Sequence, residues 1–189
     1  YNETGSILIT HKGFSGPVIF RLSAFGARYL HDNKYIGALR VNWLCMSESD
    51  VRSKIDLFKL ENGKKLVLNN KPFNHLPRRL WRDLVLSENI DSQLKWGELS
   101  KYDIESLVKC LTSKSYSINS RGPFGEEFVT AGGGSLKEIN FKTMESKICK
   151  GLFFAGEVLD IDGITGGFNF QHCWTSGWIA GKSIFLNSS

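Results

Sequence analysis

The sequence has 189 residues, of which 41% are hydrophobic and 23% are charged, and its formal net charge is +5. This composition excludes a disordered chain and a fibrous repeat, and the length allows one substantial hydrophobic core or two small ones. The sequence contains no apolar run of the roughly 18 residues that cross a bilayer and no secretory signal, so we expect no membrane partner. Because the chain begins at Tyr1 and not at Met, we expect it to be a piece of a longer protein.

The basic residues argue against a nucleic-acid partner. The excess of 24 basic over 19 acidic residues is modest, whereas nucleic-acid-binding proteins concentrate positive charge on one face. The densest basic stretch is Lys71–Asp83. We interpret it as a solvated helix face whose Trp81 and Leu84 point inward. A phosphate or nucleotide contact is the alternative.

The four cysteines form no CxxC pair, so the sequence has no zinc or dithiol redox motif. Free thiols are typical of a reducing compartment. We therefore expect a cytoplasmic protein, although a targeting segment before Tyr1 would direct it to an organelle.

The first part of the chain predicts a mixed order of strands and helices. Ser15 is expected to cap a first helix that opens near Pro17. Apolar residues at helical spacing predict further helices over Glu48–Leu60, over Pro77–Leu86 and after Ser100. Strands are expected over Gly5–Thr10, Tyr35–Leu44 and Lys114–Ser120.

The last part of the chain predicts short strands followed by one long helix. The strands are expected over Glu126–Gly133, Ser135–Ile139 and Gly151–Gly156, and the helix over Gly167–Leu186. Gly177 and Gly181 lie one turn apart on this helix, where each costs roughly 1 kcal/mol relative to alanine. We therefore expect this face of the helix to approach another backbone closely.

Residues that suit a ligand are concentrated just before the last helix. An apolar run ends on Gly156 and Glu157, and Gly166 and Gly167 open the helix. Glycine allows a ligand to approach the backbone. A helix N-terminus offers N–H groups to an anion or a flavin carbonyl, and a carboxylate accepts hydrogen bonds from sugar hydroxyls. The pattern indicates a polar cofactor site, with an ordinary strand–turn–helix as the alternative.

The loop between these glycines carries the acids Glu157, Asp160 and Asp162. Three acids in one loop can hold a hard cation, but the spacing of a calcium loop is missing. We therefore expect no metal.

The stretch "GLFFAGEVLDIDGITGGFNFQ" closely resembles the C-terminal signature of the BaiN/RdsA-type NAD(P)/FAD-dependent oxidoreductases, also called aminoacetone-oxidase-like flavoproteins. The stretches "LITHKGFSGP", "LPRRLW" and "FVTAGGGSLKEINFKTMESK" match in the order of the family, so the resemblance covers essentially the whole chain. The sequence departs at Ser6, Gly134 and Phe168, where the family usually has Glu, Val and Tyr. Roles that need those side chains do not carry over.

The resemblance implies an α/β protein with two parts. Residues 1–126 would form an α+β insert domain that covers the substrate, and residues 127–189 would form the C-terminal segment of a discontinuous, Rossmann-like FAD-binding domain. The N-terminal half of that domain is missing, since no G-x-G-x-x-G follows a strand. This half would be the partner of the chain, and the chain alone is expected to be inactive.

In the whole enzyme, the resemblance implies that NAD(P)H reduces FAD and that the flavin passes hydride to a small organic acceptor. Glu157 would lie near the ribityl chain or the pyrophosphate. The helix start would face the pyrimidine edge of the ring, where its dipole stabilises negative charge. The cofactor contacts expected in this way are Gly132, Gly133, Gly156, Glu157, Gly166, Gly167, Phe168, Asn169 and Phe170. For Gly132 and Gly133, a plain tight turn is the alternative.

His11 is the candidate proton donor, because histidine has a suitable pKa and lies in the best match of the first half. A hydrogen bond that only supports a turn is its alternative. A rival to the enzyme is a stand-alone binding module without flavin, which would bind a macromolecule through Arg78, Arg79 and Arg82.

Overall fold

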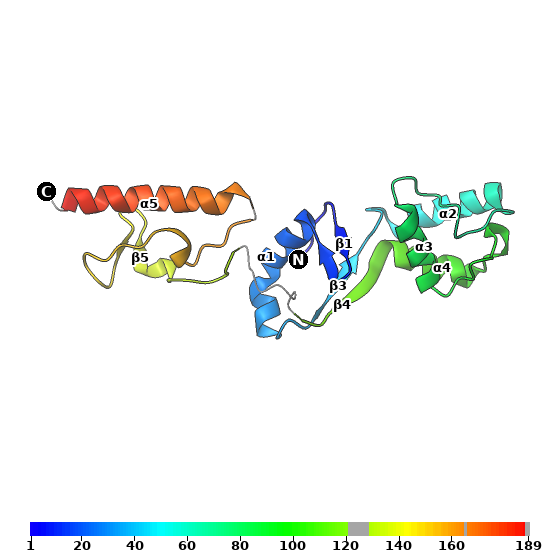
Figure 1. Ribbon diagram of the computed structural model, residues 1–189, viewed down its shortest axis with the longest axis horizontal. Coiled ribbons are helices and arrows are strands. Elements are labelled where there is room, and N and C mark those ends of the chain that lie inside the picture. Colours follow the sequence, from blue (N-terminus) through cyan, green and yellow to red (C-terminus); the bar gives the residue numbers. More distant parts are fainter. Residues whose placement is uncertain (121–128, 165, 188–189) are drawn as a thin grey trace. The chain divides into compact units, whose positions relative to one another are not determined.

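The computed structural model describes residues 1–120, 129–164 and 166–187 (Figure 1). The chain divides into two compact units. One unit comprises Tyr1–Ile36 with Asn119–Ser189, and the other comprises Gly37–Ile118. Within the described residues, no helix has both the length and the apolar character needed to cross a bilayer.

The first unit begins with a hairpin and a helix. Strands β1 (Leu8–Thr10) and β2 (Gly13–Ser15) pair antiparallel, and α1 follows over Pro17–Asp32. Gly16, and not the predicted Ser15, is the N-cap, with φ 99° and no side-chain cap. A Cβ atom at Gly16 would lie 3.1 Å from the Leu8 backbone nitrogen. The close approach of the hairpin therefore requires glycine at the cap, one residue after the predicted Ser15, whereas the predicted opening of the helix at Pro17 is confirmed.

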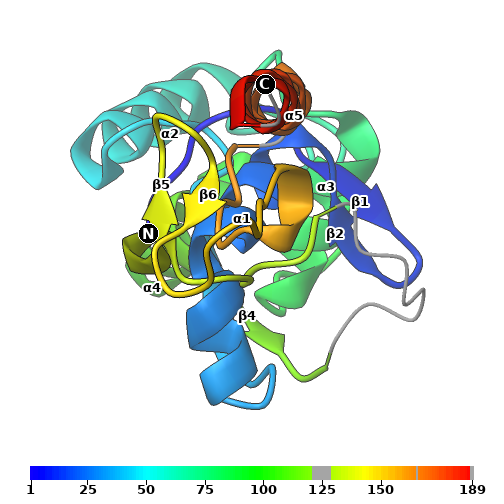
Figure 2. The same ribbon diagram turned by 90° about the vertical axis from the view of Figure 1, so that its left-hand side faces the viewer.

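The later part of this unit is built around the long helix α5, Gly167–Asn187. Before it come strands β5 (Ile139–Asn140) and β6 (Glu145–Ser146), which pair antiparallel, and the 3-10 turns η2 (Leu136–Glu138) and η3 (Gly156–Val158). Figure 2 looks along α5 and shows the β5–β6 pair. The predicted last helix is confirmed. Ala180 on one of its faces packs with Ile139, Met144 and Leu159 in a small core.

Two predicted strands in this region are wrong. Residues 136–138 of the expected Ser135–Ile139 strand form η2. The expected Gly151–Gly156 strand makes only one isolated bridge, between Glu145 and Phe153. A strand needs a partner over several residues, and β6 is two residues long, so the apolar run stays extended without becoming a ladder. Of the expected Glu126–Gly133 strand, residues 126–128 lie outside the described residues, and residues 129–133 form no strand.

The second unit is a two-stranded ribbon with a helical cluster. Strands β3 (Gly37–Val41) and β4 (Lys114–Ile118) pair antiparallel. The helices are α2 (Glu48–Asn62), α3 (Arg78–Ser87) and α4 (Lys101–Ser113), with the 3-10 turn η1 (Trp96–Glu98). Figure 1 shows α2, α3 and α4 gathered at one end of the ribbon. The Ser100 cap is confirmed, because its hydroxyl accepts from the Asp103 N–H at 3.1 Å.

The core of the second unit is organised by two buried tryptophans. The rings of Trp81 and Trp96 stack with centroids 6.1 Å apart. Their indole N–H groups donate to the carbonyls of Val67 and Asn70, both at 2.9 Å. These bonds tie the irregular segment 63–77 to the helices. Leu84 is also buried, so Trp81 and Leu84 point inward as predicted. Only residues 78–83 of the basic stretch Lys71–Asp83 lie on the helix, because residues 71–77 are irregular.

The expected boundary between residues 126 and 127 falls within residues that the structure does not describe. It concerns the organisation of a whole flavin domain, and it stays a prediction.

Candidate cofactor site at the start of helix α5

The entry to α5 is open to a ligand. Gly166 has φ 133°, a conformation that favours glycine, and a Cβ atom built on Gly166 or Gly167 would meet nothing within 4 Å. Phe168 is exposed. The first N–H groups of a helix have no partner within it, and the helix dipole makes this end attractive to negative charge. The entry therefore offers N–H donors to an anion or to a carbonyl oxygen.

Asn169 fixes the loop that leads into the helix. Its side chain is buried, its Oδ1 accepts from the Gly163 N–H at 2.8 Å, and its Nδ2 donates to the Gly163 carbonyl at 3.3 Å. The carboxamide is therefore engaged with the main chain. What Asn169 offers a cofactor is the position of the loop, together with its own place in the first turn of the helix.

Gly156, the residue before Glu157, is held against the second and third turns of α5. The Gly156 N–H donates to Ser176 Oγ at 2.9 Å, and the Gly156 carbonyl accepts from His172 Nε2 at 3.2 Å when that nitrogen carries the proton. Ser176 is buried, and its hydroxyl donates to the His172 carbonyl at 2.7 Å. Gly156 has φ 74°. Glu157 follows in η3 with its side chain exposed, so a backbone that is fixed at Gly156 presents an exposed carboxylate.

The glycines at 132 and 133 have different surroundings. A Cβ atom at Gly133 would lie 2.5 Å from the Leu159 carbonyl carbon and 2.7 Å from the Asp160 nitrogen, whereas one at Gly132 would meet nothing within 4 Å. Two backbone bonds explain this approach: Gly134 N–H donates to Val158 O at 2.8 Å, and Asp160 N–H donates to Gly134 O at 3.0 Å. The segment that contains Gly133 therefore lies beside the segment that carries Glu157.

The acids of the loop have a cationic partner. Arg28 Nη2 lies 2.5 Å from Asp160 Oδ1 and 3.8 Å from Asp162 Oδ1. The described residues contain no group of three or more His, Cys, Asp or Glu side chains placed to hold a metal ion. The two aspartates thus serve an ion pair that links α1 to the loop before α5.

Residues that support this site were missed by the sequence reasoning. His172 and Ser176 lie one turn apart on α5, and a pair of polar residues on the inner face of an apolar helix is a signal that could have found them. Arg28 carries no such signal, because it is 132 positions from Asp160.

His11 lies in the turn between β1 and β2 and is exposed. Among the described residues, no hydrogen bond or ion pair joins it to the start of α5. Its role as a proton donor stays a prediction, as do the roles of the predicted cofactor contacts.

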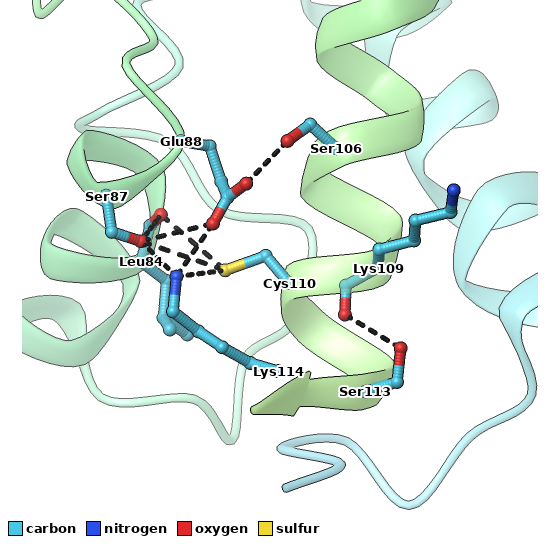
Figure 3. Close-up of polar contacts among 8 residues, drawn as sticks. All are labelled: Leu84, Ser87, Glu88, Ser106, Lys109, Cys110, Ser113 and Lys114. Atoms are coloured by element: carbon cyan, nitrogen blue, oxygen red, sulfur yellow. Dashed lines mark hydrogen bonds and ion pairs between the residues drawn. The ribbon is translucent and has the colours of Figure 1, made fainter. Parts of the chain in front are cut away.

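A second polar cluster lies in the other unit, where α3, α4 and β4 meet (Figure 3). Lys114 Nζ donates to Ser87 Oγ at 2.6 Å and to Glu88 Oε1 at 2.7 Å, and it lies 3.4 Å from Cys110 Sγ. Ser106 Oγ donates to Glu88 Oε2 at 2.5 Å. These side chains therefore supply one another's hydrogen-bond partners and link α3, α4 and β4.

The pKa values in this cluster indicate that its role is structural and not catalytic. Burial, together with the adjacent Glu88 carboxylate, raises the pKa of the Cys110 thiol from 9.0 to about 11. Burial alone would raise the pKa of Glu88, but hydrogen bonds from Lys114 and Ser106 hold that pKa below its ordinary value. Burial would lower the pKa of Lys114, but the hydrogen bond to Glu88 raises it. The thiol therefore stays neutral near pH 7, and a neutral thiol is not a nucleophile.

Comparison with known proteins gives consistent matches along the chain. The family described as HI0933-like protein Rossmann domain matches residues 5–183. The ribosomal RNA dihydrouridine synthase of Escherichia coli (strain K12) is 31% identical over 186 residues, which cover 97% of this chain and 43% of that protein. The corresponding synthase of Haemophilus influenzae is 30% identical over 184 residues, covering 97% and 42%. The 3-dehydro-bile acid delta(4,6)-reductase of Clostridium scindens is 29% identical over 181 residues, covering 96% and 44%. The chain thus spans less than half the length of these curated relatives.

Proposed function

Since the chain belongs to the HI0933-like Rossmann-domain family, we propose that it is the C-terminal portion of a flavin-dependent oxidoreductase that binds FAD at the start of α5. The observation that carries this proposal is the open glycine entry at Gly166 and Gly167, with the exposed Glu157 held beside the same helix. The mixed α/β architecture agrees with a part of a Rossmann-like domain.

Each residue of the site has a distinct task in this proposal. Gly166 and Gly167 let the first N–H groups of α5 approach the pyrimidine edge of the ring, and the helix dipole stabilises negative charge there. Glu157 accepts hydrogen bonds from the ribityl hydroxyls. His172, Ser176 and Asn169 hold the two loops that carry these groups. Bound FAD supplies the hydride chemistry, and the chain positions it and sets the local charge.

We further propose that NAD(P)H is the reductant and that the acceptor is an organic molecule with an activated C=C bond. The names of the relatives support this class of reaction, since dihydrouridine is uridine with its ring C=C bond reduced, and the bile acid enzyme is named a reductase. The two names give different substrates. The proposal for this chain therefore specifies only the class of bond that is reduced.

The proposed partner is the N-terminal, dinucleotide-binding half of the same protein, because the chain covers only 42% to 44% of the relatives' length. A cofactor held between two halves binds poorly to one of them. We therefore propose that the isolated chain is inactive.

The test compares two glycine variants in a longer protein that includes the upstream coding sequence. Gly166→Val fills the open space at the entry, and Gly151→Val is the matched control, because both glycines are exposed, have positive φ and have no neighbours within 4 Å. We expect the Gly166 variant to lose most of its bound flavin and the Gly151 variant to keep it. Equal flavin content in the two variants would contradict the proposed site.

The alternative, a binding module, has one observation in its favour. Arg78, Arg79 and Arg82 on α3 are all exposed, although Arg82 Nη1 also donates to Asn69 Oδ1 at 3.3 Å. Binding of a macromolecule by the flavin-free protein that is lost when the three arginines become glutamine would support this alternative. Nucleic-acid binding is a separate alternative that strong salt dependence would support, and the modest net charge argues against it.

A further inference from the structure

A small cavity lies between helix α1 and the loop that leads into α5, within the first unit. Its volume is about 240 Å³, and it is lined by Tyr1, Ala24, Phe25, Arg28, Asp162 and Ile164. A cavity of about 150 Å³ is large enough to hold benzene, whereas pockets for larger ligands have roughly 300–1,000 Å³. This cavity therefore has room for one substituted six-membered ring.

One wall of the cavity is aromatic. The rings of Tyr1 and Phe25 stack with their centroids 6.4 Å apart and their planes inclined by 15°. Phe25 is 43% exposed, so part of its ring can contact a ligand. Ala24 and Ile164 add apolar surface to the lining. Because aromatic rings stack on one another in offset arrangements, this wall favours a flat ligand.

The other wall is polar and carries a net negative charge. Arg28 Nη2 lies 2.5 Å from Asp160 Oδ1 and 3.8 Å from Asp162 Oδ1. The Arg28 side chain is 64% exposed, and a guanidinium has five N–H donors, so donors remain for a ligand. Two carboxylates beside one guanidinium disfavour an anionic ligand. A neutral carbonyl oxygen is therefore the acceptor that best suits Arg28.

The cavity is close to the proposed flavin entry. Ile164 lines the cavity, and Gly166, two residues later, opens the entry to α5. Two residues span at most about 7 Å. Gly163, directly before Ile164, is held by the Asn169 side chain through bonds of 2.8 and 3.3 Å. A ligand in the cavity and a ring at the entry would therefore contact the same fixed loop.

We propose that this cavity binds a neutral, flat six-membered ring that carries a carbonyl oxygen. The ring stacks on Phe25, its carbonyl accepts a hydrogen bond from Arg28, and the two aspartates keep the guanidinium in place. Two reactants of the proposed reaction carry such a ring: a cyclic acceptor whose C=C bond is conjugated with a carbonyl, and the dihydronicotinamide of NAD(P)H. The inference rests on the proposed function for these two sources.

The first experiment measures the binding of two probes, 2-cyclohexen-1-one and nicotinamide, to the longer protein that includes the upstream coding sequence. Saturation-transfer NMR detects weak binding and needs no bound flavin. Phe25→Ala removes the aromatic wall, and Tyr29→Ala is the matched control, because Tyr29 is an exposed aromatic residue one turn along α1 that does not line the cavity. We expect the Phe25 variant to bind at least one probe roughly tenfold more weakly. Equal affinities in the two variants would overturn the inference.

The second experiment fills the cavity and keeps its aromatic wall. Ala24→Leu enlarges a side chain of the lining, and Ala27→Leu is the matched control, because both alanines are half-buried on α1 and Ala27 does not line the cavity. Leucine forms helices nearly as well as alanine, so α1 should persist in both variants. We expect Ala24→Leu to weaken probe binding and Ala27→Leu to leave it unchanged. Full probe binding by the Ala24 variant would also overturn the inference.

The two flavin half-reactions, measured without oxygen, distinguish the sources of the ring. The first is reduction of the flavin by NAD(P)H. The second is reoxidation of the flavin by 2-cyclohexen-1-one, which takes up one hydride and one proton from water to become cyclohexanone. Slower reoxidation alone in Phe25→Ala assigns the cavity to the acceptor, and slower reduction alone assigns it to the nicotinamide.

The outcomes separate this inference from the proposed function. A longer protein that lacks flavin, but whose probe binding is weakened by Phe25→Ala and Ala24→Leu, would support the cavity and contradict the cofactor site. A longer protein that holds flavin and binds the probes equally in all four variants would support the cofactor site and overturn the inference.

Discussion

The carboxamide of Asn169 meets the main chain of Gly163 at both ends, with Oδ1 2.8 Å from the Gly163 nitrogen and Nδ2 3.3 Å from its carbonyl oxygen. A Cβ atom at Gly163 would lie 3.1 Å from the same Oδ1. One buried side chain and one glycine therefore fix the loop immediately before the proposed flavin-binding helix.

Replacing Asn169 with alanine should free this loop. The change leaves the Gly163 N–H and carbonyl without these partners, which costs about 1 kcal/mol for partly buried groups. We expect faster hydrogen exchange at the Gly163 amide and a lower free energy of unfolding for the unit. Gln171→Ala is the control, because Gln171 is exposed and bonds only Thr175, at 3.0 Å. Equal exchange at Gly163 in both variants would contradict the proposed role of Asn169.

Adjacent glycines should respond differently to alanine. Gly133→Ala would place a methyl group 2.5 Å from the Leu159 backbone, whereas Gly132→Ala would place one in open space. Overpacking costs about 1–3 kcal/mol, so Gly133→Ala should lower the free energy of unfolding by that much more than Gly132→Ala. Hydrogen exchange at the amides of Gly134 and Asp160, which donate the two bonds of this contact, measures the difference. A larger loss for Gly132→Ala would show that the backbone bonds of Gly134 with Val158 and Asp160 do not form as described.

The Glu88–Lys114 pair should make the second unit sensitive to acid. Because the folded state lowers the pKa of Glu88 below 4.5, its stabilisation is present above pH 4.5 and is lost as the pH falls through the lowered value. Glu88→Gln should reduce stability at pH 7 by about 1–2 kcal/mol, since Lys114 loses its carboxylate. It should also flatten the loss of stability below pH 4.5. Urea unfolding followed by the fluorescence of Trp81 and Trp96, with exposed Glu61→Gln as control, tests both parts.

The Cys110 thiol should make the same unit sensitive to alkali. The thiol ionises near pH 9.0 in the unfolded chain and near pH 11 in the folded one. Stability is therefore fully present below pH 9.0 and falls as the pH rises toward 11. Cys110→Ser removes this ionisation, so between pH 8 and pH 10.5 it should lose on the order of 2 kcal/mol less than the parent chain. The loss that remains has the same sign and comes from Lys114 and Tyr116, because the pKa of each is also raised in the folded state. An unchanged slope in the serine variant would show that the thiol is not protected by the fold.

Much of the helical structure could be predicted because its signals are local. Ser100 and Asp103 form a capping box within one turn, and the glycines before α5 mark its start within two residues. The short strands could not be predicted in the same way. The apolar run before Gly156 has strand-like residues, but β6 is two residues long and forms one isolated bridge with it, between Glu145 and Phe153.

The supports of the site depend on contacts between distant residues. Ser176 meets Gly156 across 20 positions, and Arg28 meets Asp160 across 132. Neither contact follows from spacing, so the sequence located the glycines and the carboxylate of the site but not the side chains that hold them.

The central claim is that this chain carries one half of a split flavin site. The most direct measurement is the visible absorption spectrum, with quantified release of flavin, of the 189-residue chain and of the longer protein that includes the upstream coding sequence. We predict one flavin per longer protein and almost none on the isolated chain. Flavin on neither protein would contradict the claim and reduce the start of α5 to an ordinary turn and helix, and tight stoichiometric flavin on the isolated chain would contradict the division of the site.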